Sequence, residues 1–304
     1  MAAVLALVIA WPASANYRVG MSEQSPAMFS QPAWQPLGLK RVRYIVPWDF
    51  DKHAGQNSEV VTFMSAARAA GQDVLVSFSA RRGCYINGKY SRARVCRAPS
   101  PSAFRSAFLR FRSAYPWVKT YSAWNEANHV SQPTSTAPRR AAQYYDVVRR
   151  ACSGCTVMAA DVLDQSNVRS WLRSFLHYSH GRGRIWGLHN YKDVNRHQTR
   201  GLTNVLRTVP GQVWLTETGG IVTFLPSFKT SISRASSATK YMFQLADRYD
   251  SRRRGYRSKV ARLYVYRWFG APAGARFDAG LVNPDGSPRP ALAQFRKYVA
   301  LHLK

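Results

Sequence analysis

Acidic residues are scarce in this sequence. Its 304 residues include 15 Asp and Glu against 44 Lys and Arg, which gives a formal net charge of +29. Such a charge favours anionic polymers, membrane surfaces or cell-wall material as surroundings. The basic residues are scattered, mostly in pairs such as Arg139–Arg140, and no zinc-finger, basic-zipper or RNA-recognition pattern occurs. We therefore expect no dedicated nucleic-acid function.

Long hydrophobic runs and cofactor motifs are also missing. The apolar run within residues 1–15 covers only about ten positions, too few to span a bilayer. It ends in Ala13-Ser14-Ala15, which is typical of a signal-peptide cleavage site. We expect residues 16–304 to be secreted or associated with the cell envelope, and not embedded in the membrane. The patterns GxGxxG, GxxxxGK[ST] and HExxH are absent, so we expect no cofactor and no metal.

Cysteine occurs only four times, a number that agrees with export from the cell. Four cysteines allow three pairings, and we favour the two local ones, Cys84–Cys96 and Cys152–Cys155. A four-cysteine zinc site is the alternative, but the two pairs lie far apart and the first has the wrong internal spacing. CSGC could also be a redox motif, although it follows a predicted helix rather than preceding one.

The rest of the chain alternates short apolar runs with amphipathic segments, as βα units do. Apolar residues with helical spacing, such as Phe104, Phe108 and Phe111, predict helices between the runs. No linker divides the chain, so we predict a single-domain (β/α)8 barrel, that is, an α/β TIM barrel. The eight predicted strands lie near 18–23, 41–46, 74–79, 119–125, 157–162, 185–190, 213–217 and 262–268.

Two glutamates each close one of these predicted strands. Glu126 follows the fourth strand within YSAWNEANH, and Glu217 ends the seventh within VWLTETGG. The carboxyl ends of barrel strands share one face, which also carries the longest predicted loops, residues 80–100 and 269–288. A general acid/base and a carboxylate nucleophile are what cleavage of a glycosidic bond requires. A purely structural role is disfavoured because buried carboxylates are costly.

Several strand-end segments resemble clan A of the glycoside hydrolases, the retaining enzymes typified by families 5, 10 and 39. The matching segments occur in the same chain order and span nearly the whole mature chain. VSFSARRG lacks the third-strand histidine of family 5, so a group similar to family 39 fits better. The resemblance implies that Glu126 is a protonated acid/base near neutral pH and Glu217 an ionised nucleophile. The segments are GLKRVRYIVPW (38–48), WNEAN (124–128), HNY (189–191), TETGG (216–220) and YRWFG (266–270).

The same resemblance assigns roles around the two glutamates. Arg43 and Tyr191 would hold Glu217, Asn125 would bind the sugar 2-hydroxyl, and His189 would accompany Tyr191 on the sixth strand. Trp268 would form the floor under the sugar. For Arg43, His189 and Trp268 the alternatives are an interior ion pair, a core histidine and a core tryptophan.

Four further residues follow predicted strands and are candidates for contacts with neighbouring sugars. They are Trp48, Asp49, Asp161 and His129, for which solvated loop positions are equally open.

Two other classes of protein fit parts of this pattern. One is a catalytically silent barrel that binds carbohydrate, and the other is a basic protein that anchors anionic wall polymers. Retention of both glutamates with Arg43 favours the enzyme. We expect a monomer that acts on a β-linked poly- or oligosaccharide, whose sugar and linkage the sequence leaves open.

Overall fold

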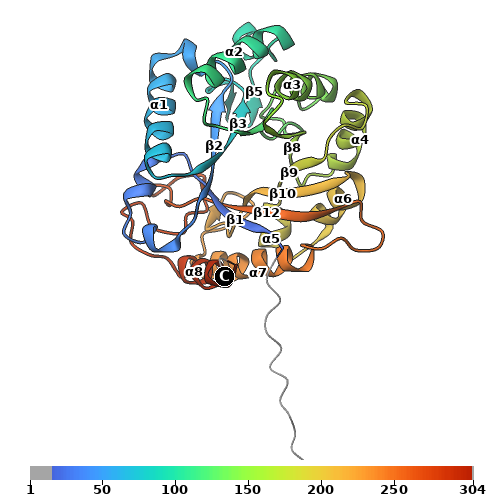
Figure 1. Ribbon diagram of the computed structural model, residues 1–304. Helices are drawn as coiled ribbons and strands as arrows, with labels where there is room; N and C mark the ends of the chain where they lie inside the picture. The colour runs from blue at the N-terminus through green and yellow to red at the C-terminus, as the bar shows by residue number, and fades with distance from the viewer. Residues whose placement is uncertain (1–15, 303–304) are drawn as a thin grey trace, which may run out of the picture.

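Parallel strands form the centre of the protein and helices surround them (Figure 1). The computed structural model describes residues 16–302, so the expected signal peptide lies outside the described residues. The strands form a nine-stranded sheet in the order β7-β6-β3-β2-β1-β12-β10-β9-β8. They are β1 (Arg18–Ser22), β2 (Arg41–Pro47), β3 (Asp73–Ser79), β6 (Thr120–Ser122), β7 (Thr156–Met158), β8 (Asp161–Leu163), β9 (Ile185–His189), β10 (Gly211–Thr218) and β12 (Ser258–Tyr266).

The two ends of this sheet are successive pieces of the chain, which closes the barrel. Only Ala159 and Ala160 separate β7 from β8, and both bond to the β9 backbone, at 2.8 Å from Ala159 N to Ile185 O and 2.8 Å from Gly187 N to Ala160 O. Nine strands therefore occupy eight barrel positions, and the predicted (β/α)8 barrel is confirmed.

The prediction of one continuous fifth strand over residues 157–162 is wrong. β7 pairs with β6 on one side, whereas β8 pairs with β9 on the other. The chain bends between the two pairings, and periodicity alone cannot reveal such a bend. The fourth strand is also shorter than predicted, because the β ladder of β6 ends at Ser122.

The predicted helices lie between the strands, and apolar stripes pack them against the barrel. Helix α2 buries Phe104, Phe108 and Phe111 and is capped by Ser100, whose Oγ accepts a bond of 3.1 Å from Ala103 N. The helices are α1 (Ala54–Ala69), α2 (Pro101–Ala114), α3 (Pro138–Ala151), α4 (Val168–Tyr178), α5 (Tyr191–Asn195), α6 (Arg200–Thr208), α7 (Ile232–Arg248) and α8 (Pro290–His302).

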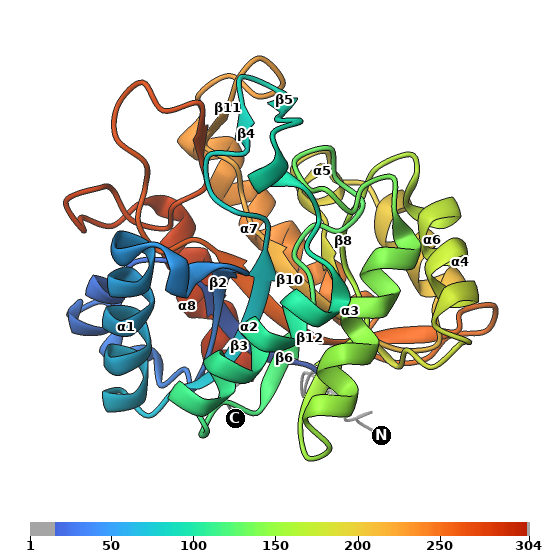
Figure 2. The same ribbon diagram turned by 90° about the horizontal axis from the view of Figure 1, so that it is seen from above.

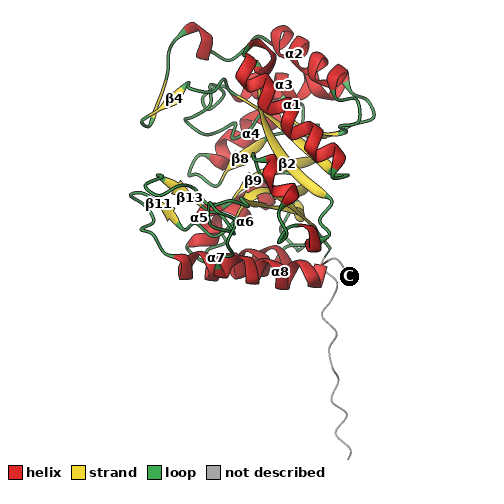
Figure 3. Ribbon diagram, turned by 90° about the vertical axis from the view of Figure 1, so that its left-hand side faces the viewer, coloured by secondary structure: helices red, strands yellow, loops and turns green. Residues whose placement is uncertain are grey.

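Two small antiparallel ribbons extend from the carboxyl ends of the strands. One joins β4 (Tyr85–Ile86) to β5 (Lys89–Tyr90), and the other joins β11 (Thr223–Phe224) to β13 (Phe277–Asp278). Both project on the same side of the molecule (Figures 2 and 3). They belong to the loops that frame the active-site face of a barrel of this type.

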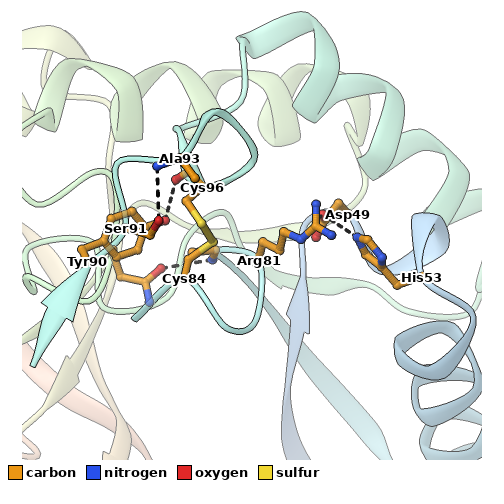
Figure 4. Close-up of a disulfide and its surroundings, with 10 residues drawn as sticks. Asp49, His53, Arg81, Cys84, Tyr90, Ser91, Ala93 and Cys96 are labelled. Carbon is orange, nitrogen blue, oxygen red and sulfur yellow. Dashed lines mark hydrogen bonds and ion pairs between the residues drawn. A yellow bond between two sulfur atoms is a disulfide. The ribbon is translucent and has the colours of Figure 1, made fainter. Parts of the chain in front are cut away.

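The four cysteines form the two local disulfides that the sequence favours. Cys84–Cys96 closes the loop that carries β4 and β5 (Figure 4), and Cys152–Cys155 follows α3 directly. In the first loop, the Tyr90 hydroxyl also donates to the Cys96 carbonyl at 2.7 Å. The disulfide and the hydrogen bond thus link parts of this loop to each other.

Candidate active site

Glu126 lies just after the fourth barrel strand, where the chain leaves the barrel. Its φ angle of +47° is uncommon for a residue other than glycine, and such positions occur often at functional sites. Backbone bonds on both sides fix the turn, from Asn125 N to Phe78 O at 2.6 Å and from Ala127 N to Asp161 O at 2.8 Å. The Glu126 side chain retains 22% exposure and lines a cavity.

Glu217 lies on β10 directly opposite His189 on β9. Its Oε1 accepts a bond of 2.6 Å from Arg43 Nη1, and its Oε2 accepts one of 3.3 Å from the Tyr191 hydroxyl. Burial raises the pKa of Tyr191 well above its usual value, and the Glu217 charge adds to this rise. Tyr191 therefore stays a donor, and Glu217 is held in one orientation beside Glu126.

Arg43 is fully buried beneath this pair and uses its whole guanidinium group. It donates to the nucleophile candidate Glu217, to Asp161 at 2.9 Å and to the side-chain amide oxygen of Asn125 at 2.5 Å. Ser22 and Ser77 accept its remaining bonds, at 3.1 and 3.0 Å. The predicted bracing contact with Glu217 is present, whereas burial keeps Arg43 out of reach of a sugar.

His189 joins the two glutamates to Asp161. Its Nδ1 is 3.1 Å from Glu126 Oε1 and 3.6 Å from Glu217 Oε2, and its Nε2 is 3.2 Å from Asp161 Oδ1. Although burial disfavours a charged ring, the charges of Glu217 and Asp161 raise the pKa of His189 to about 10. The ring is therefore an imidazolium near neutral pH, with a proton on each nitrogen.

This imidazolium changes the expected protonation of Glu126. Burial acts to raise the pKa of Glu126, but the hydrogen bond and charge of His189 outweigh it and lower the pKa. Burial is outweighed at Asp161 as well, where His189 and Arg43 lower the pKa to about 2. In the free protein these shifts favour a proton on His189 and an ionised Glu126, whereas the resemblance implied a protonated Glu126.

A cavity of about 710 Å³ opens above these groups. It is lined by both glutamates and by side chains from the loops that follow β8, β9 and β10. Aromatic rings form much of its wall, namely Tyr191, Phe224, Phe228, Tyr266 and Phe277. Such rings stack on the apolar faces of sugars, so the cavity has the composition of a saccharide site.

Trp268 is not the aromatic floor that the resemblance implied. Its side chain is fully buried in the core, where it packs edge-on against Trp34 at 5.6 Å between ring centroids. The chain leaves the barrel after Tyr266, the last residue of β12, and Tyr266 is the residue that lines the cavity. We missed Tyr266 because the resemblance placed the floor at Trp268, two positions later in the same YRWFG segment.

Three of the other expected sugar contacts are also placed elsewhere. Asp161 is fully buried, and it positions Arg43 and His189 instead of facing the cavity. Trp48 packs on the core, with Lys52 at 5.1 Å from its ring. Asp49 is 3.2 Å from His53 and 3.8 Å from Arg81, beside the loop closed by Cys84 and Cys96 (Figure 4).

His129 does line the cavity, as expected, with its Nδ1 3.8 Å from Glu126 Oε2. The other lining residues that follow β8 and β9 were not predicted, and they include Asp164, Lys192 and Arg196. Burial raises the pKa of Asp164 to about 7. No periodicity or motif distinguishes these loop residues from solvated ones, so only their placement in the folded barrel reveals them.

Glu126, His189 and Glu217 offer three donor atoms that lie within 4.8 Å of one another. A metal ion requires deprotonated ligands, whereas the raised pKa of His189 favours a protonated ring beside the two glutamates. The donor set therefore suits proton transfer better than metal binding. It also places an oxygen of Glu126 within 4.8 Å of an oxygen of Glu217.

A parallel barrel with two carboxylates at the carboxyl ends of its strands defines a TIM-barrel glycosidase. Residues 100–295 match the family described as glycosyl hydrolase catalytic core, and the chain belongs to this family. It is a glycosidase, as the paired glutamates predicted. Comparison with curated protein sequences found no match.

Solved structures with the same fold come from clan A, which confirms the resemblance seen in the sequence. A GH5_18 enzyme from Streptomyces cattleya, solved with GlcNAc, has a TM-score of 0.64 at 14% identity and covers 96% of this chain and 81% of its own. A family 39 glycoside hydrolase from Bacteroides cellulosilyticus has a TM-score of 0.60 at 15% identity, with coverage of 96% and 64%. Xylanase 10B from Thermotoga maritima has a TM-score of 0.59 at 10% identity, with coverage of 95% and 97%.

The sequence also led us to expect a protein that is not embedded in a membrane, and the length and apolar character of the helices can be compared with this expectation. Within residues 16–302, no helix combines the length and apolar character needed to cross a bilayer.

Proposed function

We propose that the protein is a secreted, retaining glycoside hydrolase that cleaves β-linkages of a poly- or oligosaccharide by double displacement. Glu217 is the nucleophile and Glu126 the acid/base. The observation that carries this proposal is that oxygens of the two glutamates lie within 4.8 Å of each other. Retaining enzymes hold their carboxyl groups about 5–5.5 Å apart, whereas inverting enzymes need roughly 6.5–9.5 Å for a water molecule.

The nucleophile is prepared by its two donors. Arg43 Nη1 at 2.6 Å and the Tyr191 hydroxyl at 3.3 Å stabilise the ionised form of Glu217 and aim it. In the first step Glu217 attacks the anomeric carbon, the bond to the leaving oxygen breaks, and Glu126 protonates that oxygen. In the second step Glu126 removes a proton from water, which attacks the anomeric carbon and releases Glu217.

Glu126 must carry a proton in the first step, and His189 is placed to supply it. A bound sugar displaces water from the cavity and makes isolated charges more costly. Transfer of the proton across the 3.1 Å bond from His189 Nδ1 to Glu126 Oε1 converts an ion pair into two neutral groups. Substrate binding therefore favours the protonated acid, although the pKa of Glu126 is lowered in the free protein.

Asn125 and Tyr266 are suited to hold the sugar. Arg43 bonds to the amide oxygen of Asn125, which leaves the amide donors of Asn125 for a sugar hydroxyl. Tyr266 lines the cavity beside both glutamates and offers a ring for stacking. These contacts, together with Tyr191, would place the anomeric carbon between the two carboxylates.

The test measures release of reducing ends from β-linked glucan, xylan, mannan and galactan. We expect the wild type to cleave at least one polymer, Glu217→Gln to be inactive, and Glu126→Gln to lose about 10²-fold or more. Asp146→Asn, which removes a carboxylate on the outer helix α3, is the matched control and keeps full activity. Equal release by wild type and Glu217→Gln would show that Glu217 is not the nucleophile.

Stereochemistry separates the retaining from the inverting mechanism. We expect proton NMR of the first product to show the same anomer as the substrate. On an aryl β-glycoside whose leaving group needs no protonation, added azide should restore turnover to Glu126→Ala with a β-glycosyl azide as product, since azide needs no general base. An inverted first product would contradict the double displacement.

If the protein were a catalytically silent carbohydrate-binding barrel, these proteins would bind a polymer, but none of them would release reducing ends from it. Secretion belongs to the same proposal and rests on the sequence of residues 1–15 and on the paired local cysteines. A monomeric state is proposed with it. Size-exclusion chromatography with light scattering, on protein recovered from the medium of a secreting host, tests both.

A further inference from the structure

One side of the catalytic cavity carries positive charge. The short helix α5 starts two residues after His189, and its Lys192 and the following Arg196 both line the cavity with Glu126 and Glu217. Both side chains are exposed. The cations therefore reach the space into which a substrate must extend from the glutamates.

These two cations lack acidic partners. The ion pairs around the catalytic centre join Arg43 and His189 to carboxylates, and within residues 16–302 neither Lys192 nor Arg196 forms one. Apart from the two glutamates, the one acidic residue among the described lining residues is Asp164. Burial raises the pKa of Asp164 to about 7, so this carboxyl is partly neutral near pH 7.

Arg196 packs against the aromatic wall of the cavity. Its guanidinium lies 5.5 Å from the centroid of the Phe228 ring, and the guanidinium of Arg234 lies 5.3 Å from the same ring. Arg234 in turn donates to the backbone oxygens of Ile221 and Val222, each at 3.0 Å. A cation fixed against an aromatic wall loses little freedom when it binds an anion.

We propose that the saccharide bound in this cavity carries anionic substituents, and that Lys192 and Arg196 bind them. The inference rests on the proposed function and names the substrate class for the same site. A carboxylate or a sulfate on a sugar beside the scissile bond would accept charge-assisted hydrogen bonds from both side chains. The net charge of +29 would also draw such a polymer toward the protein.

The test compares three forms of each β-linked glucan, mannan and galactan, namely the neutral polymer, the polymer oxidised at C6 to uronate, and the sulfated polymer. The variant Lys192→Gln/Arg196→Gln removes the two cations. The control variant Arg252→Gln/Arg254→Gln removes two exposed positive charges in the loop before β12, at the opposite end of the barrel. Rates are measured by reducing-end release, and affinities by gel retardation of each cation variant combined with Glu217→Gln.

We expect the wild type to cleave an anionic form with at least tenfold higher kcat/KM than its neutral form. The cation variant should lose this preference and keep its rate on the neutral polymer, while the control variant behaves as wild type. Higher rates on the oxidised or on the sulfated form identify the anion as carboxylate or sulfate. The same loss should appear in the affinities, which do not depend on turnover.

The two proposals fail in different ways. Cleavage that depends on Glu217, without preference for either anionic form, overturns the inference and leaves the proposed function intact. Cleavage that persists in Glu217→Gln overturns the proposed function. If no form is cleaved or retained by any of the proteins, both are overturned.

Discussion

Arg43→Met is the substitution that tests most directly how the catalytic carboxylates are held. Methionine fills a similar volume but removes the charge and every donor of the guanidinium. In the wild type these donors serve Glu217 and Asp161, at 2.6 and 2.9 Å. Asp161 is fully buried, so no water can replace the lost partner.

The expected loss of stability follows from burial. Removing one partner of a buried ion pair costs about 3 to 5 kcal/mol, because the other charge is left in a medium of low polarity. The loss should depend on pH. Since the pKa of Asp161 is lowered to about 2, its ionised form stabilises the fold above pH 3.8 and stops doing so as the pH falls through 2. The difference between wild type and variant is therefore larger at pH 7 than at pH 3.

Arg41→Met provides the matched control on the same strand. Arg41 is 4.0 Å from Asp73, and the two side chains are 22% and 44% exposed. Such a pair contributes about 1 kcal/mol or less. The free energy of unfolding is measured by urea denaturation at pH 7 and pH 3 for the three proteins. If Arg43→Met is no less stable than Arg41→Met, the buried network does not stabilise the fold as we argue.

Three further predictions concern the floor of the cavity, the bridging histidine and the loop disulfide. Tyr266→Ala should lower kcat/KM about tenfold or more because the Tyr266 ring lines the cavity, whereas Trp268→Ala should lower the free energy of unfolding in urea by about 3 to 5 kcal/mol because the Trp268 ring fills the core. The reverse pattern would restore Trp268 as the floor. The pKa of His189 is raised from 6.5 to about 10, so its charged form contributes fully to the free energy of unfolding below pH 6.5, and this contribution, about 5 kcal/mol at most, is lost as the pH approaches 10. The same pH dependence of unfolding in His189→Gln would refute this. Replacing Cys84 and Cys96 with serine should lower the free energy of unfolding by about 3 kcal/mol, since the bond closes a loop with a sequence separation of 12, and no change would mean that the loop does not contribute to global stability.

The main outline of this protein is encoded in local sequence patterns. Each apolar run and each amphipathic stripe is a local feature, and eight runs separated by helices allow few arrangements other than a closed parallel barrel. The positions of Glu126 and Glu217 at strand ends then place both on one face. The disulfides are local too, and a short separation made the pairing Cys84–Cys96 the simplest choice.

Side-chain environments at the site depended on the tertiary structure. Trp268 and Tyr266 lie two positions apart, so the alternation of a strand assigns them to the same side. Only the point at which β12 ends decides that Tyr266 lines the cavity while Trp268 enters the core. Likewise Asp161 was predicted to face the cleft, but the close packing of β8 on β9 buries it. A methyl group at Gly187 would clash with its Oδ1.

Local spacing along the chain was enough to predict the class of fold, the two disulfides and the two carboxylates. The charge environment of the site, in contrast, follows from the folded arrangement. The pKa of His189 is raised because three carboxylates from three separate segments surround it. Lys192 and Arg196 matter because the barrel places them at the same cavity. Such electrostatic relations depend on distances across the fold, and no local pattern contains them.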